Sequence, residues 1–267
     1  MLKSPKATTP SQRNYIKFCQ EKLSKFSLLK SKLKGFKKLS GRNNLGKITS
    51  AAKGGGHKQR YRKIEFFRKD ISTGIVISQE YAPNRNCNIM AIFDFITKNY
   101  FYIIAPKYLK IGDIVKSGKI AESRIGHTLP VSRLPAGSLL HCISVKSFEK
   151  SQISRSAGTF SLLIEKTIRQ GRIQVSSGEQ RFLSGKCLAT IGVVSNDLFF
   201  LTTRGKAGRS RWLNDRPKVR GVAKNSTDHP HGGGEGKTSK KRNALTPWGK
   251  PVKKGSTSRS KNKLVIR

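Results

Sequence analysis

The stretch GIVISQEY, residues Gly74–Tyr81, decides the fold class of this 267-residue chain. β-branched residues alternate with polar ones along it, though not strictly, and turn residues come directly before and after it. Leu139–Val145 (LLHCISV) shows a similar alternation. Such runs are typical of half-buried strands in an all-β protein. The sequence therefore predicts strands at both places.

Further runs rich in β-branched and aromatic residues lie between turn residues, and we predict a strand in each: Arg62–Phe67, Cys87–Phe95, Tyr100–Ala105, Ser138–Val145, Phe160–Ile168, Gly171–Val175, Lys186–Val194 and Leu198–Thr202. Short strands at this spacing indicate a sandwich or small barrels. The 130 residues from 71 to 200 suit two small barrels better than one large one. We place the break between the barrels at Ser123–Pro130, where the strand pattern stops.

The two ends of the chain carry most of its charge. The chain has 55 Lys+Arg against 14 Asp+Glu, a formal net charge of +41. The net charge is +17 in residues 1–70, +8 in 71–200 and +16 in 201–267, so +33 of the net +41 lies in the two ends of the chain. Leucines and phenylalanines among the lysines of Lys22–Leu39 suggest a short helix. Gly41–Gly56 and Gly205–Arg267 have too little apolar surface to offset their ordering entropy, so we expect a partner to order them.

This charge balance points to a nucleic-acid partner. A sequence pI of about 10.8 and strong self-repulsion both favour binding to a polyanion. The sequence has no basic amphipathic helix, lipidation signal or apolar run of membrane-spanning length, so no membrane partner is expected. The N-terminus lacks the apolar core of a secretory signal. The four cysteines (Cys19, Cys87, Cys142 and Cys187) form no Cys-x-x-Cys, which predicts reduced, mostly buried thiols.

Two basic segments are candidate RNA contacts. In Gly54–Arg62 (GGGHKQRYR), three glycines let backbone amides approach a phosphate, and the cations and Tyr61 supply charge and a stacking face. A flexible linker is the alternative for this segment. Gly205–Gly221 (GKAGRSRWLNDRPKVRG) places guanidinium groups, which bind phosphate bidentately, among small residues. We expect its Trp212 to anchor the tail on the second barrel rather than to stack on a base.

The run DHPHGGGEG, residues Asp228–Gly236, allows three interpretations. A metal site could use His229, His231, Asp228 and Glu235, but no further His or Cys lies nearby in the sequence. Catalysis by a general base lacks an identifiable nucleophile or acid partner. We favour neutral histidines that hydrogen-bond RNA from a loop entering a narrow space. Asp228 would then fix the tautomer of a neighbouring imidazole or bind a hydrated magnesium ion on phosphate.

Ordered motifs along almost the whole chain resemble one family, the universal large-subunit ribosomal protein L2. The matching motifs are Gly41–Thr49, Gly54–Lys58, Pro83–Arg85, Arg155–Thr159, Gly205–Gly208, Arg216–Gly221, Asp228–Gly236 and Thr246–Gly249. The resemblance implies an OB-fold barrel followed by an SH3-like barrel, with long basic extensions at both ends. We expect an N-terminal extension at 1–58, the OB-fold barrel at 59–125, the SH3-like barrel at 126–201 and a C-terminal extension at 202–267.

The resemblance also implies a structural, non-enzymatic role in translation. The expected partners are large-subunit ribosomal RNA, neighbouring large-subunit proteins and the small subunit, with no membrane or small-molecule substrate. No cofactor or protein-held metal is expected, although magnesium could accompany the RNA. Asp228, His229 and His231 would lie near the peptidyl transferase centre, where RNA performs the chemistry. The expected RNA-binding residues are Arg42, Asn43, Lys47, Gly54, Gly55, Gly56, His57, Lys58, Arg60, Arg62, Arg85, Arg155, Ser156, Lys206, Arg209, Arg211, Trp212, Arg216, Lys218, Arg220, His229, His231, Gly232, Gly233, Gly234, Lys237 and Trp248.

Three departures from the family pattern stand out. Asn225-Ser226-Thr227 replaces the usual Asn-Pro-Val, which should loosen the approach to the histidine loop, and Ala82 replaces an Asp. Phe148–Gln152 replaces a glycine-rich loop, which puts that loop's RNA contacts in doubt. Abundant Lys, Ile, Phe and Asn suggest an organelle-encoded protein without a cleaved presequence, mitochondrial first, then plastid, then bacterial. The rival interpretations are a metallohydrolase acting on nucleic acid and an architectural DNA-binding protein.

Overall fold

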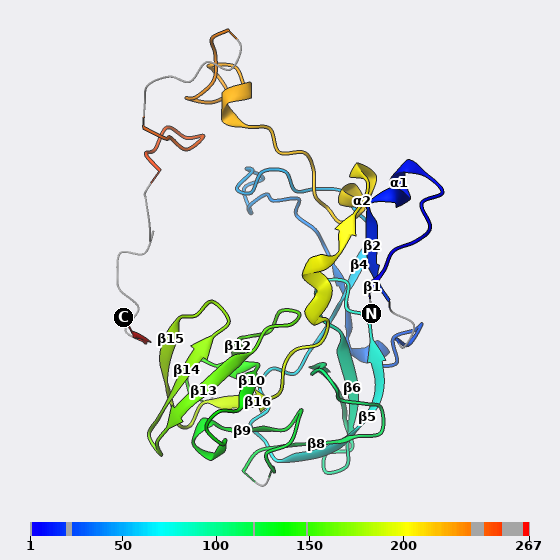
Figure 1. The fold of residues 1–267 in the computed structure, drawn as a ribbon, viewed down its shortest axis with the longest axis vertical. Coiled ribbons are helices and arrows are strands. Elements are labelled where there is room, and N and C mark those ends of the chain that lie inside the picture. Colours follow the sequence, from blue (N-terminus) through cyan, green and yellow to red (C-terminus); the bar gives the residue numbers. More distant parts are fainter. Residues whose placement is uncertain are drawn as a thin grey trace. The chain divides into compact units, whose positions relative to one another are not determined.

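The computed structural model describes residues 2–19, 23–119, 121–147, 149–235, 243–252 and 264–266. The described residues are almost entirely strand, turn and loop, and the predicted all-β class is confirmed (Figure 1). The chain divides into two compact units. The first unit comprises residues 1–37, 58–206 and 263–267, and the second comprises residues 38–57 and 207–262. None of the helices among the described residues has the length and apolar content needed to cross a bilayer.

Four strands form the main sheet of the first barrel: β5 (Ser72–Glu80), β6 (Ile89–Asp94), β7 (Tyr100–Ile104) and β8 (Ile114–Ser117). Alternation along β6 supplies two cores, because successive side chains point to opposite faces of a sheet. Met90 and Ile92 pack with Val76 on one face. Ile89 and Ala91 pack with Tyr102, Leu29 and Ile64 on the other.

The second barrel has its own core. Its strands are β9 (Thr128–Pro130), β10 (Leu139–His141), β11 (Ile143–Ser144), β12 (Ser151–Ile153), β13 (Ser161–Lys166), β14 (Gln170–Val175), β15 (Gln180–Ser184) and β16 (Leu188–Ile191), with a 3-10 turn, η2 (Val131–Arg133), after β9. Leu140, Leu163 and Ile173 are fully buried at its centre. β18 (Val265–Ile266) pairs with the outer edge of β15.

The two barrels share one continuous sheet, in the order β18-β15-β14-β13-β10-β16-β9-β8-β5-β6-β7. The link between them is a short parallel contact in which Ser117 of β8 faces Thr128 of β9. The expected boundary at 125/126 falls in the loop between these strands. That division remains a prediction, because both barrels belong to the first unit.

Several local expectations were wrong. Leu198–Thr202 is not a strand, because Asn196 adopts a left-handed conformation and starts the 3-10 helix η3 (Asp197–Leu201). The run Ser138–Val145 is broken at Cys142, whose φ is +49°. The short strands β8, β9 and β15 were missed, since pairing rather than local pattern defines them.

The N-terminal segment is more ordered than its composition predicts. β1 (Leu2–Lys3) and β2 (Tyr15–Phe18), separated by α1 (Pro10–Arg13), form a three-stranded sheet with β17 (Thr203–Arg204). Residues 23–39 contain no α-helix, so the helix suggested there was wrong. They form a 3-10 turn, η1 (Lys30–Lys32), and β3 (Leu33–Phe36), which pairs with β4 (Gln59–Arg62). Long-range pairing has overridden the local pattern.

Tyr102 fixes the N-terminal segment to the first barrel. Its buried hydroxyl accepts a hydrogen bond from the Leu29 backbone N–H at 3.2 Å and donates to the Glu80 carboxylate, whose oxygens lie 3.0 and 3.1 Å away. The same carboxylate accepts from the Leu28 backbone N–H at 3.0 Å. Burial, before any neighbouring group, raises the pKa of Tyr102 to about 12, so the phenol remains a donor at neutral pH. Residues on both sides of the expected boundary at 58/59 therefore pack together.

Candidate nucleic-acid interface

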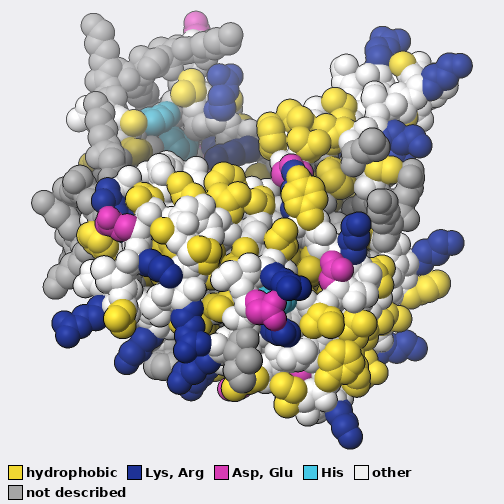
Figure 2. Space-filling view, turned by 60° about the horizontal axis from the view of Figure 1, so that its bottom comes forward, with side chains coloured by type: hydrophobic (Ala, Val, Ile, Leu, Met, Phe, Trp, Pro, Cys, Tyr) yellow, Lys and Arg dark blue, Asp and Glu magenta, His cyan; other side chains and the backbone are white. Residues whose placement is uncertain are grey.

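Positive charge is far in excess of what the protein's own acids can neutralise. If every one of the 14 acids paired with a different cation, 41 of the 55 Lys and Arg side chains would still lack an acidic partner. Figure 2 shows many more Lys and Arg side chains than Asp and Glu on the face that it presents. Exposed ion pairs contribute little stability. The Lys and Arg side chains without an acidic partner are therefore available to bind a polyanion.

The second unit begins with a compact turn at residues 41–50. The Asn43 side-chain carbonyl oxygen accepts hydrogen bonds from the backbone N–H groups of Leu45 (3.0 Å) and Lys47 (2.9 Å), and the Asn43 N–H donates to the Lys47 carbonyl. An Asn at this position stabilises a turn through its own side chain. The side chains of Arg42 and Lys47 are left exposed and form no ion pair with a described residue.

The glycine-rich stretch then docks on a segment about 160 residues later in the sequence. The Gly54 N–H donates to the Asn214 carbonyl at 3.2 Å, and the His57 N–H donates to the Trp212 carbonyl at 3.2 Å. The Arg216 N–H donates to the Ala52 carbonyl at 3.0 Å, and Lys53 pairs with Asp215 at 3.1 Å. Gly54–His57 is therefore not the flexible linker considered as an alternative. Nothing in the local sequence signals the contributions of Lys53, Asn214 and Asp215.

Glycine is required at one position in this contact. Gly56 has a φ of +80°, and a Cβ added there would lie 2.7 Å from the Trp212 carbonyl oxygen and 2.9 Å from the Asn214 nitrogen. Neighbouring Gly55 has a φ of +72° but nothing within 4 Å of its added Cβ. Gly56 thus lies close to backbone of the protein itself, and the predicted approach of these glycines to a phosphate stays a prediction.

The helix α2 (Ala207–Trp212) presents basic side chains and has no buried residue. Arg211 donates from Nη1 to the Asp215 carbonyl at 3.2 Å, which orders the turn after the helix. Trp212 is 59% exposed, and its expected role as an anchor on the second barrel stays a prediction. Its backbone carbonyl accepts the hydrogen bond from the His57 N–H. The exposed indole leaves base stacking open as its role.

The histidine loop is held together by its own imidazoles. After the 3-10 turn η4 (Gly221–Ala223), His229 is only 7% exposed, and its Nδ1 accepts a hydrogen bond from the His231 backbone N–H at 3.0 Å. His231 Nε2 accepts from the Leu245 backbone N–H at 2.9 Å. Two accepting nitrogens assign the proton to Nε2 in His229 and to Nδ1 in His231. Burial, followed by His231 and Lys224, lowers the pKa of His229, which favours its neutral form.

These contacts change the expected roles of the loop residues. Backbone N–H groups fix the tautomers, whereas the exposed Asp228 makes no side-chain hydrogen bond with a described residue. In these tautomers the remaining nitrogen of each imidazole carries the proton, so neither ring presents a free lone pair to a metal ion. The described residues contain no group of three or more His, Cys, Asp or Glu that could hold a metal ion. The Asn225 carbonyl accepts from Asp228 N–H (3.1 Å) and His229 N–H (3.2 Å), closing the turn without the family's proline.

Two glycines make room for the histidine loop. A Cβ on Gly221 would lie 2.6 Å from the Cε1 atom of His229. A Cβ on Gly232 would overlap the carbonyl oxygens of Lys224 and Asn225, well under 3.0 Å away. Gly233 is looser, with the Ser226 Cβ at 3.1 Å, but its φ is +84°. Gly221 was not among the predicted site residues, because its contact is with a ring eight positions later.

A smaller basic cluster draws on residues of both barrels. The guanidinium carbons of Arg85 and Arg155 lie 5.0 and 5.1 Å from the centre of the Phe66 ring. Arg62 donates to the Ser27 hydroxyl at 2.8 Å, and Arg60 is exposed on the same strand, β4. Phe66, which positions the two guanidinium groups, was missed as a site residue because it reads as an ordinary strand residue.

The predicted residues thus fall into two groups. The first unit holds Lys58, Arg60, Arg62, Arg85, Arg155, Ser156 and Lys206. The second unit holds Arg42, Asn43, Lys47, Gly54, Gly55, Gly56, His57, Arg209, Arg211, Trp212, Arg216, Lys218, Arg220, Asp228, His229, His231, Gly232, Gly233, Gly234 and Trp248. Lys237 and Phe148 lie outside the described residues. Trp248 is 71% exposed in a turn between Leu245 and Pro251.

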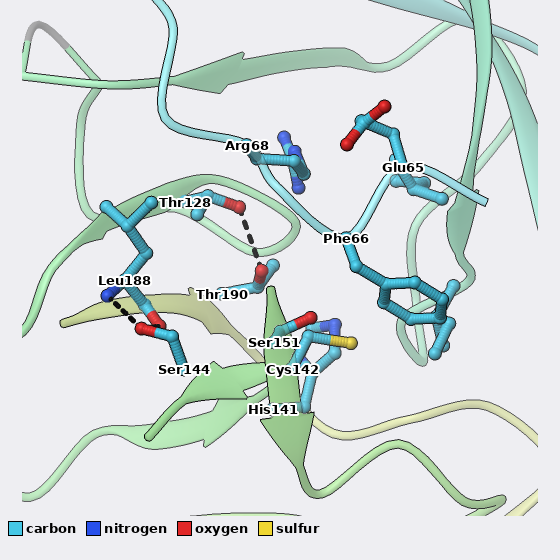
Figure 3. Close-up of a pocket in the computed structure, with 12 residues that line it drawn as sticks. Glu65, Phe66, Arg68, Thr128, His141, Cys142, Ser144, Ser151, Leu188 and Thr190 are labelled. Atoms are coloured by element: carbon cyan, nitrogen blue, oxygen red, sulfur yellow. Dashed lines mark hydrogen bonds between the residues drawn. The ribbon is translucent and has the colours of Figure 1, made fainter. Parts of the chain in front are cut away.

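A cavity between the two barrels is too small for a ligand (Figure 3). Its volume of about 20 Å³ is enough for a water molecule, whereas ligand pockets measure hundreds of Å³. Arg68 borders it and donates to the carbonyls of Gly126 (3.0 Å) and Lys116 (3.4 Å), joining the two barrels. Burial lowers the pKa of Arg68 to about 10, so it remains charged at neutral pH.

His141, on the wall of the same cavity, predicts a pH-dependent stability. Burial, with a smaller contribution from Arg68, lowers its pKa from 6.5 to about 4, although Nδ1 donates to the Gly192 carbonyl at 3.0 Å. Between these pH values the unfolded chain binds a proton that the folded chain does not. We expect the free energy of unfolding to fall as pH drops from 6.5 towards 4, by roughly 3 kcal/mol in total.

Urea unfolding of the full chain at a series of pH values measures this effect. His141→Asn should reduce the slope between pH 6.5 and 4, and the same substitution at exposed His57 is the control. An unchanged slope in His141→Asn would contradict the assignment.

Comparisons with known proteins identify the same family as the sequence motifs. The family model described as "Ribosomal Proteins L2, RNA binding N-terminal domain" matches residues 29–117, and the one described as "Ribosomal Proteins L2, C-terminal domain" matches residues 124–249. The chain is 42% identical over 269 residues to the large ribosomal subunit protein uL2 of Sphingopyxis alaskensis, covering 100% of this chain and 96% of that protein. It is 43% identical over 270 residues to uL2 of Sinorhizobium medicae (100% and 97%) and 44% over 265 residues to uL2 of Vesicomyosocius okutanii (98% and 96%).

Proposed function

This chain belongs to the ribosomal protein L2 family, and on that premise we propose that it is a structural, RNA-binding constituent of the large ribosomal subunit. The family contributes structure rather than catalysis, so the chain is not an enzyme and no residue is assigned a chemical step. Ribosomal RNA and ribosomal proteins are its partners.

The observation that carries the RNA-binding role is the set of unpaired cations in the second unit. Docking of Gly54–His57 on Trp212–Arg216 brings basic segments from both ends of the chain into one unit. Arg42, Lys47, Arg216, Lys218 and Arg220 are exposed there and form no ion pair with a described residue. Cations held in fixed positions without acidic partners favour phosphate contacts.

Finer assignments extend this proposal. The loop at Asp228–Gly234 would approach the peptidyl transferase centre, and the protein would support association with the small subunit. The Lys-, Ile-, Phe- and Asn-rich composition favours a mitochondrial ribosome, while the bacterial relatives fit a bacterial cytoplasm as well. Cell fractionation separates these locations from each other and from a plastid, since only a mitochondrial protein would sediment with mitochondrial ribosomes.

Sedimentation and crosslinking test the central proposal. A native lysate is sedimented through a high-salt sucrose gradient, irradiated with ultraviolet light, and the RNA attached to this chain is mapped. Crosslinks from residues 228–248 to large-subunit RNA near the peptidyl transferase centre would support the role and the loop placement. A chain that stays at the top of the gradient without crosslinks would contradict both. Release by DNase rather than RNase would favour the DNA-binding alternative, and stoichiometric zinc or manganese the metallohydrolase.

Salt dependence gives a second, quantitative expectation. If about ten terminal cations contact phosphates, log K for large-subunit RNA should fall with log salt at a slope of about −7 to −9. Arg42→Ala should reduce the magnitude of that slope by about 1, because one fewer counterion is released. Arg124→Ala is the matched control, since Arg124 is 76% exposed but lies 2.9 Å from Glu122. Filter binding at several salt concentrations measures both variants, and equal slopes would contradict an Arg42–phosphate contact.

A further inference from the structure

An exposed row of apolar side chains crosses all four strands of the first barrel's sheet. The strand register places Ile114 of β8 opposite Ile75 of β5, Ile75 opposite Phe93 of β6, and Phe93 opposite Tyr100 of β7. The rings of Phe93 and Tyr100 lie 4.9 Å apart, centre to centre. Ile114 is 52% exposed and Tyr100 is 47% exposed. The row is thus continuous across the sheet, with Ile75 and Phe93 half-buried at its centre and Ile114 and Tyr100 exposed at its ends.

The row lies on a sheet face whose other end is already covered. Phe93 has the same side-chain direction as Ile89 and Ala91, four and two positions earlier on β6, because side chains alternate along a strand. Those two residues are fully buried beneath Leu29 and Ile64. Phe93 and Ile75 are only half-buried, and among the described residues neither belongs to that buried cluster.

A buried carboxylate fixes the hairpin beside the row. Asp94, 2% exposed, accepts hydrogen bonds from the Thr97 hydroxyl at 2.7 Å and from the backbone N–H groups of Thr73 and Ile96, both at 3.2 Å. This turn holds Phe95 (49% exposed) edge-on to Phe93, with ring centres 5.7 Å apart. The aromatic surface is therefore presented in a set conformation rather than by a mobile loop.

The charge around the row indicates what covers it. In a chain with 55 cations, β5, β6, β7 and β8 together contain one, Lys116, and its Nζ lies 2.9 Å from Glu122. By comparison, the short strand β4 alone carries two cations, Arg60 and Arg62. A surface that stacks on nucleic-acid bases needs cations to follow the phosphates. Besides the paired Lys116, the turn between β6 and β7 adds one exposed cation, Lys98. An apolar patch with so few cations is typical of a protein contact.

We propose that the row Ile114–Ile75–Phe93–Tyr100 is a docking surface for an apolar segment of a neighbouring protein in the large subunit. This inference rests on the proposed ribosomal function. The partner would contribute aliphatic or aromatic side chains that cover Tyr100 and Ile114, the two most exposed members of the row.

Lysine substitution in the assembled particle tests the proposal. The double variant Tyr100→Lys, Ile114→Lys places two charges in the contact and should lower the occupancy of one subunit protein at least about tenfold in gradient-purified large subunits. Quantitative mass spectrometry measures occupancy. The matched control is Ile168→Lys, Phe200→Lys, which changes two apolar residues that are 90% and 78% exposed away from the row.

A photo-crosslinking variant keeps the test independent of folding. With p-benzoyl-phenylalanine at position 100 in an otherwise unchanged chain, irradiated subunits should yield a crosslink to the same protein that the lysine variant loses. A crosslink to RNA, or full occupancy of every protein in the lysine variant with this chain retained, would overturn the docking surface alone. Absence of the unchanged chain from large subunits would instead refute the proposed function and this inference together.

Discussion

Gly232→Ala is expected to open the histidine loop while both barrels stay folded. The new Cβ would overlap the carbonyl oxygens of Lys224 and Asn225, which cannot move aside as a flexible side chain could. The Lys224 carbonyl also accepts the Gly233 N–H at 3.1 Å, so that bond would be lost. Overpacking against backbone at two points should cost roughly 2–4 kcal/mol locally.

Hydrogen exchange of the full chain measures this loss. The N–H groups of Gly233 and His231 close the loop onto Lys224 and His229, and their protection should fall about 100-fold, since 1.4 kcal/mol corresponds to a factor of ten. Gly35→Ala is the control, because Gly35 has no atom within 4 Å of its added Cβ and no positive φ. Unchanged protection in Gly232→Ala would contradict the close packing of the loop. Gly233→Ala should reduce this protection less by steric overlap, because the atom nearest to its added Cβ, the Cβ of Ser226, lies 3.1 Å away.

Gly56→Ala is expected to detach the glycine-rich segment from the segment after α2. An alanine at a φ of +80° is strained by about 1–2 kcal/mol. Overlap with the Trp212 carbonyl oxygen at 2.7 Å and the Asn214 nitrogen at 2.9 Å adds to that cost. The hydrogen bonds from Gly54 and His57 should open, and binding of the full chain to large-subunit RNA should weaken because Arg42 and Lys47 lose their fixed position relative to Arg216.

Gly55→Ala is the matched control for this variant. Its φ of +72° imposes similar strain, but its added Cβ meets nothing within 4 Å. The difference between the two variants in exchange of the His57 N–H, and in RNA affinity by filter binding, isolates the steric contribution. Equal changes in both variants would show that backbone strain, rather than overlap with Trp212 and Asn214, causes the faster exchange and the weaker RNA binding.

Much of the fold could be predicted from periodicity. The predicted run Gly74–Tyr81 covers most of β5 and Tyr100–Ala105 contains β7, because alternation and β-branched composition are local properties of a strand. The predictions failed where a neighbouring turn or a distant partner strand, rather than local composition, decides the structure. Leu198–Thr202 has strand composition but follows a left-handed Asn196, and β8 and β9 are too short to show a pattern before their partners are known. Residues 23–39 read as helical until β4 pairs with Leu33–Phe36.

By itself the sequence determined the all-β class, the excess of cations at both ends, and the glycine- and histidine-containing segments, because composition and local alternation specify these. Only the tertiary structure decided how those segments are used. It showed that Gly54–His57 docks on Trp212–Arg216, that the imidazoles of His229 and His231 close their own loop, and that four residues from four strands form one apolar row. Each of these depends on the register and close approach of backbone segments distant in sequence, and no local pattern encodes which distant partner a segment meets.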